Sequence, residues 1–286
     1  MHPTILLLTA LLSSPAAAAA SGGDSGPPDV AAGSPEHGKA ATADASPVEP
    51  GVLEAELCYG PTWNDRGGAA GFDRSGPAEA HVFTATVTRG LVQDVDVRLS
   101  VGFGTVHDAA HLHADGSAPR DGSGLSDAIV GARWRFLNLA SRAFEMALTA
   151  DAVVPVGSPH TPTRVGMTQE YWSARGALVA TRDLGRLTAN AELAWAVPVS
   201  GDAGGLRSTA QANAALGYEL SPGLQPELEV NYQASLGPGS QVLGVTAGLI
   251  ASFGDGYRVV GAVQRGVWGR NAIQTTSAVL AFKTAL

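Results

Sequence analysis

Twelve stretches of the sequence alternate apolar and polar side chains, and this period of two constrains the fold more than any other feature. Successive side chains of a β-strand point to opposite faces, so each stretch predicts a strand with one apolar and one polar face. In residues 94–104, Val95 and Leu99 share the apolar face, while Asp96 and Arg98 share the other. No helical periodicity of comparable length competes with this pattern. The twelve stretches are residues 52–60, 80–89, 92–104, 125–136, 143–155, 171–182, 186–197, 208–220, 225–236, 241–253, 257–266 and 272–284.

The lengths of these stretches and of their connections favour a membrane barrel. Most stretches run for about 10 to 13 residues, longer than the usual ~5–6 residues of globular strands and sufficient for a tilted membrane span. Long connections follow the first, third, fifth and seventh stretches, and short turns rich in Gly, Pro and Asp follow the second, sixth, eighth and tenth. Bacterial outer-membrane barrels have short periplasmic turns, long extracellular loops and an even number of strands. The sequence therefore predicts an all-β protein, a transmembrane antiparallel up-and-down β-barrel of about 12 strands with both termini periplasmic. A soluble β-sandwich is the alternative, since it also has alternating strands.

Aromatic side chains support the membrane interpretation. They lie mostly near the ends of the predicted strands, where rings with a polar edge are most favourable at the level of the lipid headgroups. Ordinary core aromatics would lie more often in the middle of strands. The residues are Trp63, Trp134, Trp172, Trp195, Trp268, Tyr171, Tyr232 and Tyr257.

The N-terminal part of the chain predicts export. Residues 1–20 hold an apolar run at 5–12, a Ser/Pro break and an alanine tract, which is typical of a cleaved signal peptide. Residues 21–50 are rich in Ala, Gly, Pro and Ser and contain almost no large apolar side chain, so we expect a disordered linker. The barrel is then expected to span residues 51–286. After the signal peptide no apolar stretch of about 18 residues predicts a transmembrane helix.

Composition excludes several classes of function. The formal net charge is −8, so there is no surplus of basic side chains to neutralise the phosphates of a nucleic acid. The single cysteine, Cys58, excludes an intrachain disulfide and a site with several cysteine ligands. No Ser and His stand at a spacing that predicts a hydrolase, so we expect no enzymatic activity and no cofactor.

Charged side chains on the polar faces are the main functional candidates, because the polar face of a barrel strand points into the lumen. Two interpretations remain open. The charges either line a channel through which a solute passes, or pair across strands and fill a narrow interior. The lumen-lining candidates are Glu54, Glu56, Asp94, Asp96, Arg98, Asp127, Arg133, Arg135, Glu145, Asp151, Arg175, Glu192, Glu227 and Glu229.

One connection, residues 105–124, is rich in imidazole and carboxylate groups. His107, His111 and His113 lie close together in it, and these side-chain types bind transition metals. No predicted element holds them in place, and a solvated polar loop is the simpler explanation. We therefore expect no metal site, with this loop as the weak candidate.

Three sequence stretches resemble a known family. They are GLVQDVDVRLSVGFG at 90–104, GLSDAIVGARWRFL at 124–137 and ADAVVPVGSP at 150–159, and NAALGYELSPGLQPELEVNYQ at 213–233 is similar to a later hairpin of that family. In this order they resemble the outer-membrane β-barrel family named for the meta-pathway of phenol degradation (MetA-like). The second stretch carries the motif residues Gly124, Ser126, Asp127, Gly131, Arg133, Trp134 and Arg135.

This resemblance covers residues 51–286 and implies a porin-like transport barrel for hydrophobic or aromatic compounds, without catalytic residues. The expected location is the cell outer membrane of a Gram-negative-type bacterium. The expected partners are outer-membrane lipid, a small-molecule solute and the barrel-assembly machinery during insertion. Two alternatives are a non-transporting surface or adhesion barrel that acts through its long loops, and a periplasmic binding module.

Overall fold

A computed structural model describes most of the chain. The described residues are 40–64, 78–108, 121–140, 143–159, 164, 166–200, 208–236, 239–254, 256–272 and 274–286. The expected signal peptide, residues 1–20, lies outside them. Within the described part of the chain, no helix is long and apolar enough to cross a membrane.

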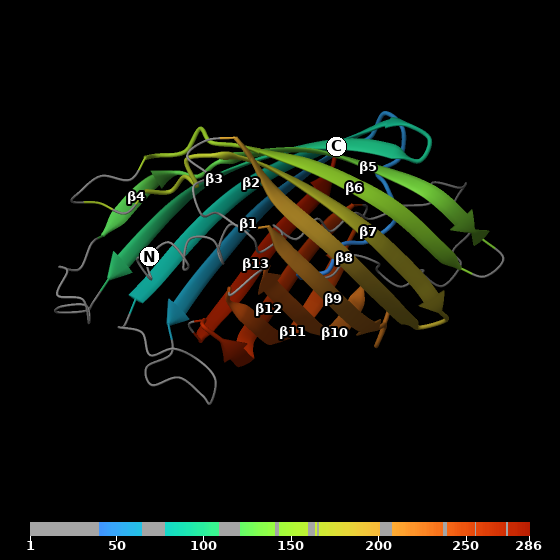
Figure 1. Cartoon of the computed structure of the whole chain (residues 1–286). Helices are drawn as coiled ribbons and strands as arrows, with labels where there is room; N and C mark the ends of the chain where they lie inside the picture. Colours follow the sequence, from blue (N-terminus) through green and yellow to red (C-terminus); the bar gives the residue numbers. More distant parts are fainter. Residues whose placement is uncertain are drawn as a thin grey trace.

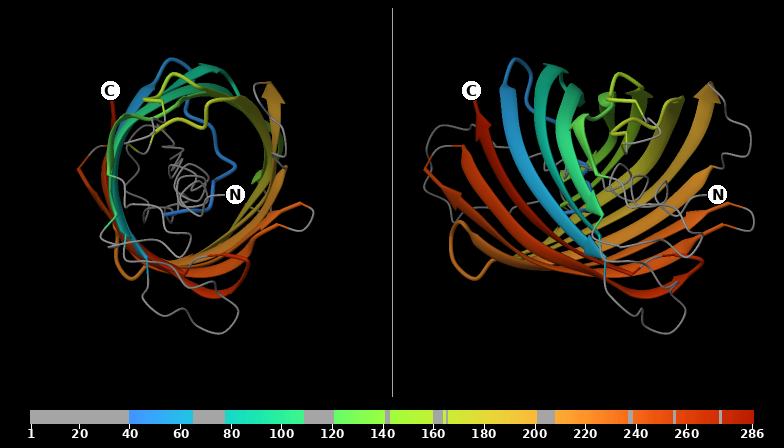
Figure 2. Two further views of the ribbon diagram at one scale, coloured as in Figure 1. Left: turned by 60° about the vertical axis from the view of Figure 1, so that its left-hand side comes forward. Right: turned by 90° about the vertical axis from the view of Figure 1, so that its left-hand side faces the viewer.

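The described residues form antiparallel strands that close into a barrel (Figures 1 and 2). The strands are β1 (Leu53–Asn64), β2 (Ala78–Val92), β3 (Val95–Asp108), β4 (Gly122–Leu125), β5 (Ala128–Leu139), β6 (Phe144–Val154), β7 (Trp172–Leu184), β8 (Leu187–Ser200), β9 (Thr209–Tyr218), β10 (Leu224–Ser235), β11 (Gln241–Phe253), β12 (Tyr257–Arg270) and β13 (Thr275–Ala285).

Apart from β4, each strand pairs with the strands before and after it in the wall, and β1 pairs with β13 to complete the ring. β4 and β5 both pair with β3: β5 opposite the first half of that strand and β4 opposite Phe103 to Val106. β4 and β5 therefore occupy one position in the wall, interrupted at Ser126 and Asp127. The result is the predicted 12-stranded up-and-down barrel, so the predicted fold class is confirmed, while the periplasmic position of the termini stays a prediction.

The observed strands follow the predicted ones closely, because turn chemistry and alternation are both local signals. The main difference is at the end of the barrel where the longer connections lie. β1 continues through Pro61 to Asn64, and β3 continues to Asp108, so both strands extend into stretches that the sequence predicts as loops. Proline is tolerated in β1 without breaking the pairing of the strand with β2.

The barrel is apolar outside and polar inside, the reverse of a soluble protein. Leu57, Leu193 and Leu228 are more than half exposed on the outer face. Glu192 and Glu229, on the inner face of β8 and β10, the strands of Leu193 and Leu228, are buried. A soluble sandwich would bury the leucines and expose the glutamates, so this distribution excludes that alternative.

Aromatic rings lie on the outer face in two bands. One band is at the end with the longer connections, and the other is at the end with the tight turns, where Tyr257 lies against Phe282 and Arg186 covers the ring of Tyr218. Such bands are typical of barrels that cross a membrane. The exposed rings of the first band are Trp63, Trp172, Trp195 and Trp268, and those of the second are Trp134, Phe136, Tyr218, Phe253, Tyr257 and Phe282.

A segment from before the first strand lies inside the barrel. Residues 40–50 run through the lumen before the chain enters β1, and Figure 2 shows this blue stretch within the ring of strands. Asp44, Ala45 and Val48 are almost completely inaccessible to solvent. The composition predicts a disordered linker over residues 21–50. In the structure, residues 40–50 are instead packed against the inner wall, and residues 21–39 lie outside the described residues. We call residues 40–50 the lumen segment.

Candidate functional site: the barrel lumen and its internal segment

Two glutamates of β10 hold the beginning of the lumen segment. The backbone N–H of Ala40 donates to Oε1 of Glu227 at 3.1 Å, and that of Ala41 donates to Oε1 of Glu229 at 2.9 Å. The hydroxyl of Thr42 donates to the other oxygen of Glu229 at 2.8 Å. Because a buried N–H needs an acceptor, these carboxylates replace the strand partner that the segment does not have.

Further along the lumen segment, acceptors come from three other strands. The N–H of Ala43 donates to Oε2 of Glu192 on β8 at 3.2 Å, and the N–H of Ala45 donates to the hydroxyl of Thr181 on β7 at 3.0 Å. The N–H of Val48 donates to Oδ2 of Asp96 on β3 at 2.9 Å. The segment is therefore held by side chains of the wall and not by a continuous backbone ladder.

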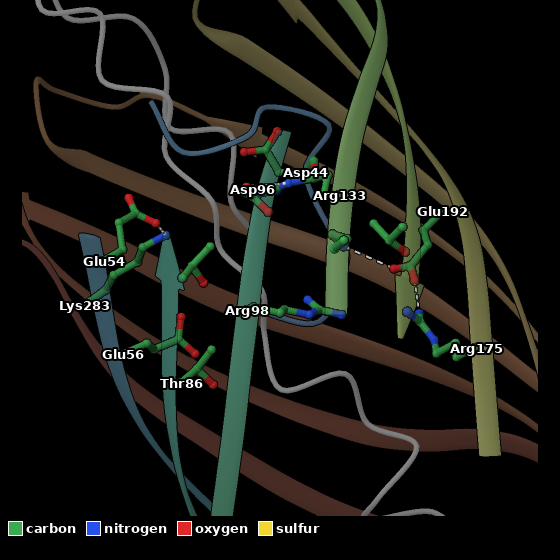
Figure 3. Close-up of a pocket in the computed structure, with 14 residues that line it drawn as sticks. Asp44, Glu54, Glu56, Thr86, Asp96, Arg98, Arg133, Arg175, Glu192 and Lys283 are labelled. Carbon is green, nitrogen blue, oxygen red and sulfur yellow. Dashed lines mark hydrogen bonds and ion pairs between the residues drawn. The ribbon is translucent and has the colours of Figure 1, made fainter. Parts of the chain in front are cut away.

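Asp44 is the polar centre of the lumen segment. Its Oδ1 accepts hydrogen bonds from the N–H of Ser46 at 2.7 Å and from the hydroxyl of Thr181 at 3.3 Å, and its carbonyl oxygen accepts one from Nη1 of Arg133 at 3.1 Å. The hydroxyl of Ser46 donates to Glu145 at 2.5 Å. Figure 3 shows Asp44 beside Asp96 and Arg133.

The segment leaves the lumen past a glycine at the end of β2. The N–H of Gly51 donates to the carbonyl of Gly90 at 2.9 Å. A Cβ added at Gly90 would lie 1.9 Å from the carbonyl oxygen of Glu49. Only glycine allows the two backbones to approach this closely.

A chain of ion pairs crosses the inner wall from β3 to β8. Both oxygens of Asp151 accept from Nη2 of Arg98 at 2.8 Å, and Oδ2 also accepts from Arg175 at 3.3 Å. Arg175 in turn pairs with Glu192, the same carboxylate that accepts from the lumen segment (Figure 3). Buried charges are tolerated when each is paired and hydrogen-bonded, and this chain meets that condition.

Two shorter networks extend the first. Arg133 pairs with Asp96 on the neighbouring strand, and Arg135 pairs with Asp94 at 2.6 Å and with Glu145 at 2.6 Å. On the other side of the lumen, Nζ of Lys283 on β13 lies 2.6 Å from Oε2 of Glu54 on β1, so the pair bridges the two strands that close the barrel.

The motif that carried the family resemblance now has a physical explanation. Arg133 and Arg135 point inward to the networks above, and Trp134 between them points to lipid. Gly131 makes room for the ion pair of the facing strand, because a Cβ there would lie 2.0 Å from Oδ1 of Asp151 and 3.0 Å from Nε of Arg98. The inward residues of the motif are therefore part of the lumen network.

Asp127, at the break between β4 and β5, fastens the connection between β6 and β7. Its carboxylate accepts from the N–H of Gly157 at 3.1 Å and from the N–H of Gln169 at 2.8 Å. Met167 of the same connection is buried against Ala80 of β2. Burial, together with the nearby Asp127 carboxylate, raises the pKa of Tyr171. Asp127 thus organises one rim of the barrel.

Little space remains where the lumen segment meets the ion-pair networks. A cavity of about 30 Å³ lies between Asp44 and the wall, lined also by Glu54, Glu56 and Thr86 (Figure 3). That volume accommodates on the order of one or two water molecules. Oδ2 of Asp44 and Oε1 of Glu56 are buried there without a hydrogen-bond partner among the described residues, which is the arrangement that ordered water satisfies.

Twelve of the fourteen lumen-lining candidates lie at inward positions of the wall strands, whereas Asp94 lies in the turn between β2 and β3 and Asp127 at the break between β4 and β5. Nearly all of the fourteen take part in the contacts described above. Nine are buried: Glu54, Glu56, Asp96, Asp127, Arg133, Asp151, Glu192, Glu227 and Glu229. Five are half-buried: Asp94, Arg98, Arg135, Glu145 and Arg175. The charges thus pair with one another and with the segment, and the passage of a solute along them stays a prediction.

Several residues of this site were not among the candidates, and Lys283, Thr181 and Asp44 illustrate why. Lys283 follows the outward Phe282, so the alternation could have identified it as an inward cation. Thr181 lies between Ala180 and Arg182 and carries no charge, and its role as an acceptor has no sequence signal. Asp44 lies in a stretch whose composition predicts disorder, so no pattern indicated it.

The histidine-rich connection contributes no metal site among the described residues, where no group of three or more potential ligands comes together. His107 is exposed, and its Nδ1 lies 3.0 Å from a carboxylate oxygen of Asp121. His111 and His113 lie outside the described residues, so the expectation for this loop stays as it stands. Cys58 is half-buried and carries a free thiol.

Comparisons with solved structures support the fold. The chain is similar to the COG4313 outer membrane channel from Pseudomonas putida F1, with a TM-score of 0.72 at 13% sequence identity over 85% of this chain and 98% of that chain. It is also similar to the beta domain of the Bordetella autotransporter BrkA, with a TM-score of 0.53 at 13% identity over 83% of this chain and 100% of that chain. At these identities the likenesses establish an outer-membrane type of β-barrel fold.

A comparison with curated proteins found no match. A family model, in contrast, matches residues 65–282, which is most of the chain and almost all of the barrel. The matched range includes the ion-pair networks on β3, β5, β6, β7 and β8 and the two glutamates of β10. The fold and the family are those of outer-membrane barrels and not of enzymes. The chain belongs to the family described as Putative MetA-pathway of phenol degradation.

Proposed function

We propose that this protein is an outer-membrane channel for the passive transport of small solutes, with hydrophobic or aromatic compounds as its cargo, and that the lumen segment closes it at rest. The family supports a transport barrel, and the apolar outer face supports a position in lipid. In the proposed orientation both termini and the tight turns are periplasmic. Export by a cleaved signal peptide in residues 1–20 is part of the same proposal.

The way in which the lumen segment is held supports its proposed closing role. Every hydrogen bond described between Ala40–Val48 and the wall involves a side chain of the wall and not its backbone. The twelve wall strands make their own backbone ladders without it. A segment held in this way can leave the lumen without opening any strand pair. Barrels of about eight strands are filled by their own side chains, whereas the lumen of this twelve-stranded barrel also holds the buried residues Asp44, Ala45 and Val48.

An apolar part of the inner wall supports the choice of cargo. Ile250 on β11, Val260 and Ala262 on β12 and Ala281 on β13 form a buried apolar cluster that faces the lumen. Four adjacent inward positions without a polar group are unusual in a barrel whose interior is otherwise charged. A hydrophobic or aromatic solute would find there a surface that the rest of the lumen does not offer.

The test is solute flux through the purified protein in liposomes and planar bilayers. Ala45, fully buried against Ala147, Ala177 and Val179, is the position to change. Ala45→Glu places a carboxylate in this apolar contact beside Asp44 and should expel the segment, whereas Ala45→Gly removes only a methyl group and serves as the matched control. We expect Ala45→Glu to increase the flux of benzyl alcohol and the bilayer conductance at least severalfold over the wild type and the control.

Folding of each variant is verified by the shift in gel mobility on heating that intact barrels show. If neither the wild type nor a folded Ala45→Glu variant gives flux above protein-free liposomes for a range of solutes, the channel function is wrong. The chain would then be a surface barrel that acts through its loops.

A further inference from the structure

We propose that the lumen wall around Glu229 and Ile250 is a binding site for a small amphiphilic organic cation, a primary amine with a short alkyl or aryl group. Residues Ala40 to Thr42 are its internal occupant at rest. The proposal rests on the proposed channel function, because such a cation would reach the site through the lumen.

Ala40 lies between two unlike surfaces. Its methyl group belongs to the buried apolar cluster of Ile250, Val260, Ala262 and Ala281 on β11 to β13. Its backbone N–H donates to Glu227 on β10, the strand next to β11. The wall at this point therefore accepts a hydrogen-bond donor and a small hydrocarbon group in adjacent positions.

Glu229 adds a second carboxylate on the same face of β10, since residues two apart on a strand share a face. It is fully buried and accepts from Ala41 and Thr42 of the lumen segment. Outside the lumen segment, its described donor is the side-chain amide of Asn231, at 3.5 Å. The lumen segment thus supplies the closer donors of this carboxylate.

Glu229 differs from three other buried carboxylates of the lumen in the kind of group that binds it. Asp96, Asp151 and Glu192 each pair with an arginine. Among the described residues, by contrast, Glu229 makes hydrogen bonds with neutral donors and no ion pair. A buried carboxylate without a cation is costly, and the cost rises further when its neutral donors leave. Withdrawal of the lumen segment would therefore leave an anionic site that favours a cation with several N–H donors.

A primary ammonium group fits this requirement, since it has three donors and no acceptor. Three donors in the present occupant, two backbone N–H groups and one hydroxyl, reach the two glutamates at 2.8–3.1 Å. The hydrocarbon part of the cation would take the place of the Ala40 methyl group on the apolar cluster. A neutral aromatic compound would use the apolar cluster alone, so the ammonium group should add affinity.

The experiment compares benzylamine, which is protonated at pH 7, with benzyl alcohol of nearly equal size. Binding to the full-length protein in detergent is measured by calorimetry, and flux is measured in liposomes. In the Ala45→Glu variant, whose segment is displaced, we expect benzylamine to bind about tenfold more tightly than benzyl alcohol. In the wild type, benzylamine should bind more weakly than in this variant, because the lumen segment competes for the same carboxylate.

Two substitutions in the Ala45→Glu background locate the site. Glu229→Gln keeps the shape of the side chain and removes its charge, so it should abolish the preference for benzylamine over benzyl alcohol. Leu228→Ala, on the same strand but facing lipid, is the matched control and should leave the preference unchanged. Heat-modifiable gel mobility verifies that each barrel is folded.

Equal binding of the two compounds in Ala45→Glu, or an unchanged preference in Glu229→Gln, would overturn the proposed site. Flux of benzyl alcohol with no preference for benzylamine would leave the channel function intact and reject the site alone. Charge-dependent binding that Glu229→Gln abolishes, in a protein that shows no flux, would support the site and reject the channel function.

Discussion

Arg133 and Asp96 stand opposite each other on neighbouring strands of the barrel, and both also hold the lumen segment. The guanidinium group of Arg133 binds the carboxylate of Asp96 and donates to the carbonyl of Asp44. The same carboxylate oxygen of Asp96 accepts from the N–H of Val48. One ion pair of the wall is therefore also an anchor for the segment that we propose as the closing element.

Replacing Arg133 should weaken both the wall and the anchor. Arg133→Met keeps much of the side-chain volume but leaves Asp96 buried without its cation, which typically costs ~3–5 kcal/mol. We expect a lower temperature of thermal unfolding, measured by circular dichroism in detergent, together with a higher bilayer conductance.

The control for this substitution is Arg182→Met, at an exposed position of β7. Neutralising the partner as well, in the double variant Arg133→Met with Asp96→Asn, should recover a substantial part of the lost stability. If the double variant is less stable than Arg133→Met alone, the ion pair is not the cause of the loss.

Gly131 should not tolerate a methyl group. Gly131→Ala places a Cβ within 2.0 Å of Oδ1 of Asp151, so the ion pair between Asp151 and Arg98 must shift. Overpacking of this kind typically costs ~1–3 kcal/mol. Equilibrium unfolding in denaturant measures the change in the free energy of unfolding.

Gly261 is the matched control, since it also lies in a strand and a Cβ there meets nothing within 4 Å. Gly261→Ala should leave the stability unchanged or raise it slightly, because alanine restricts the unfolded chain. Equal effects of the two substitutions would mean that the ion pair does not require the space at Gly131.

Cysteine labelling can test the position of the lumen segment directly. In a Cys58→Ala background, a thiol introduced by Ala45→Cys should react with a membrane-impermeant maleimide at least tenfold more slowly than one introduced by Pro50→Cys. Ala45 is fully buried, whereas Pro50 is exposed at the end of the segment. The rates are measured by mass spectrometry of the folded protein. Similar rates at the two positions would show that the segment does not rest inside the barrel.

The outer face should respond to charge in a way that depends on depth in the membrane. Val230 lies near the middle of β10 and faces outward. Val230→Arg should cost ~2–4 kcal/mol in vesicles, the typical cost of arginine at the bilayer midplane, whereas Leu220→Arg, in a tight turn, should cost ~0–1 kcal/mol. Unfolding and refolding in lipid vesicles measures both values. An equal and small cost at the two positions would contradict the proposed position in lipid.

Much of the fold could be predicted from the sequence, because the signals that define a strand are local. Alternation assigns Leu99 to one face and Asp96 to the other whatever the strand pairs with. Turn residues separate the strands, and the alternation of long and short connections indicates an up-and-down order. The break at Ser126 and Asp127 could not be predicted, since both residues fit the alternating pattern of the strand that they interrupt.

The candidate site was predictable only in part. Alternation brings Arg133, Asp151 and Glu192 to the inner face, but it does not say which carboxylate each arginine meets. That choice depends on the register between strands and on their tilt in the closed barrel. The pair of Lys283 and Glu54 shows this most clearly, because it exists only after the first and last strands have met.

The sequence by itself determined the all-β class, the number of wall strands and the side chains that face the lumen, since these follow from a period of two residues and from local turn chemistry. Only the tertiary structure decided what fills that lumen. Residues 40–50 have small side chains and cannot bury enough apolar surface to order themselves, and their composition therefore predicts a disordered linker. The closed barrel supplies what the segment lacks: carboxylates and hydroxyls from four distant strands that accept its backbone N–H groups, and apolar clusters that receive its methyl groups.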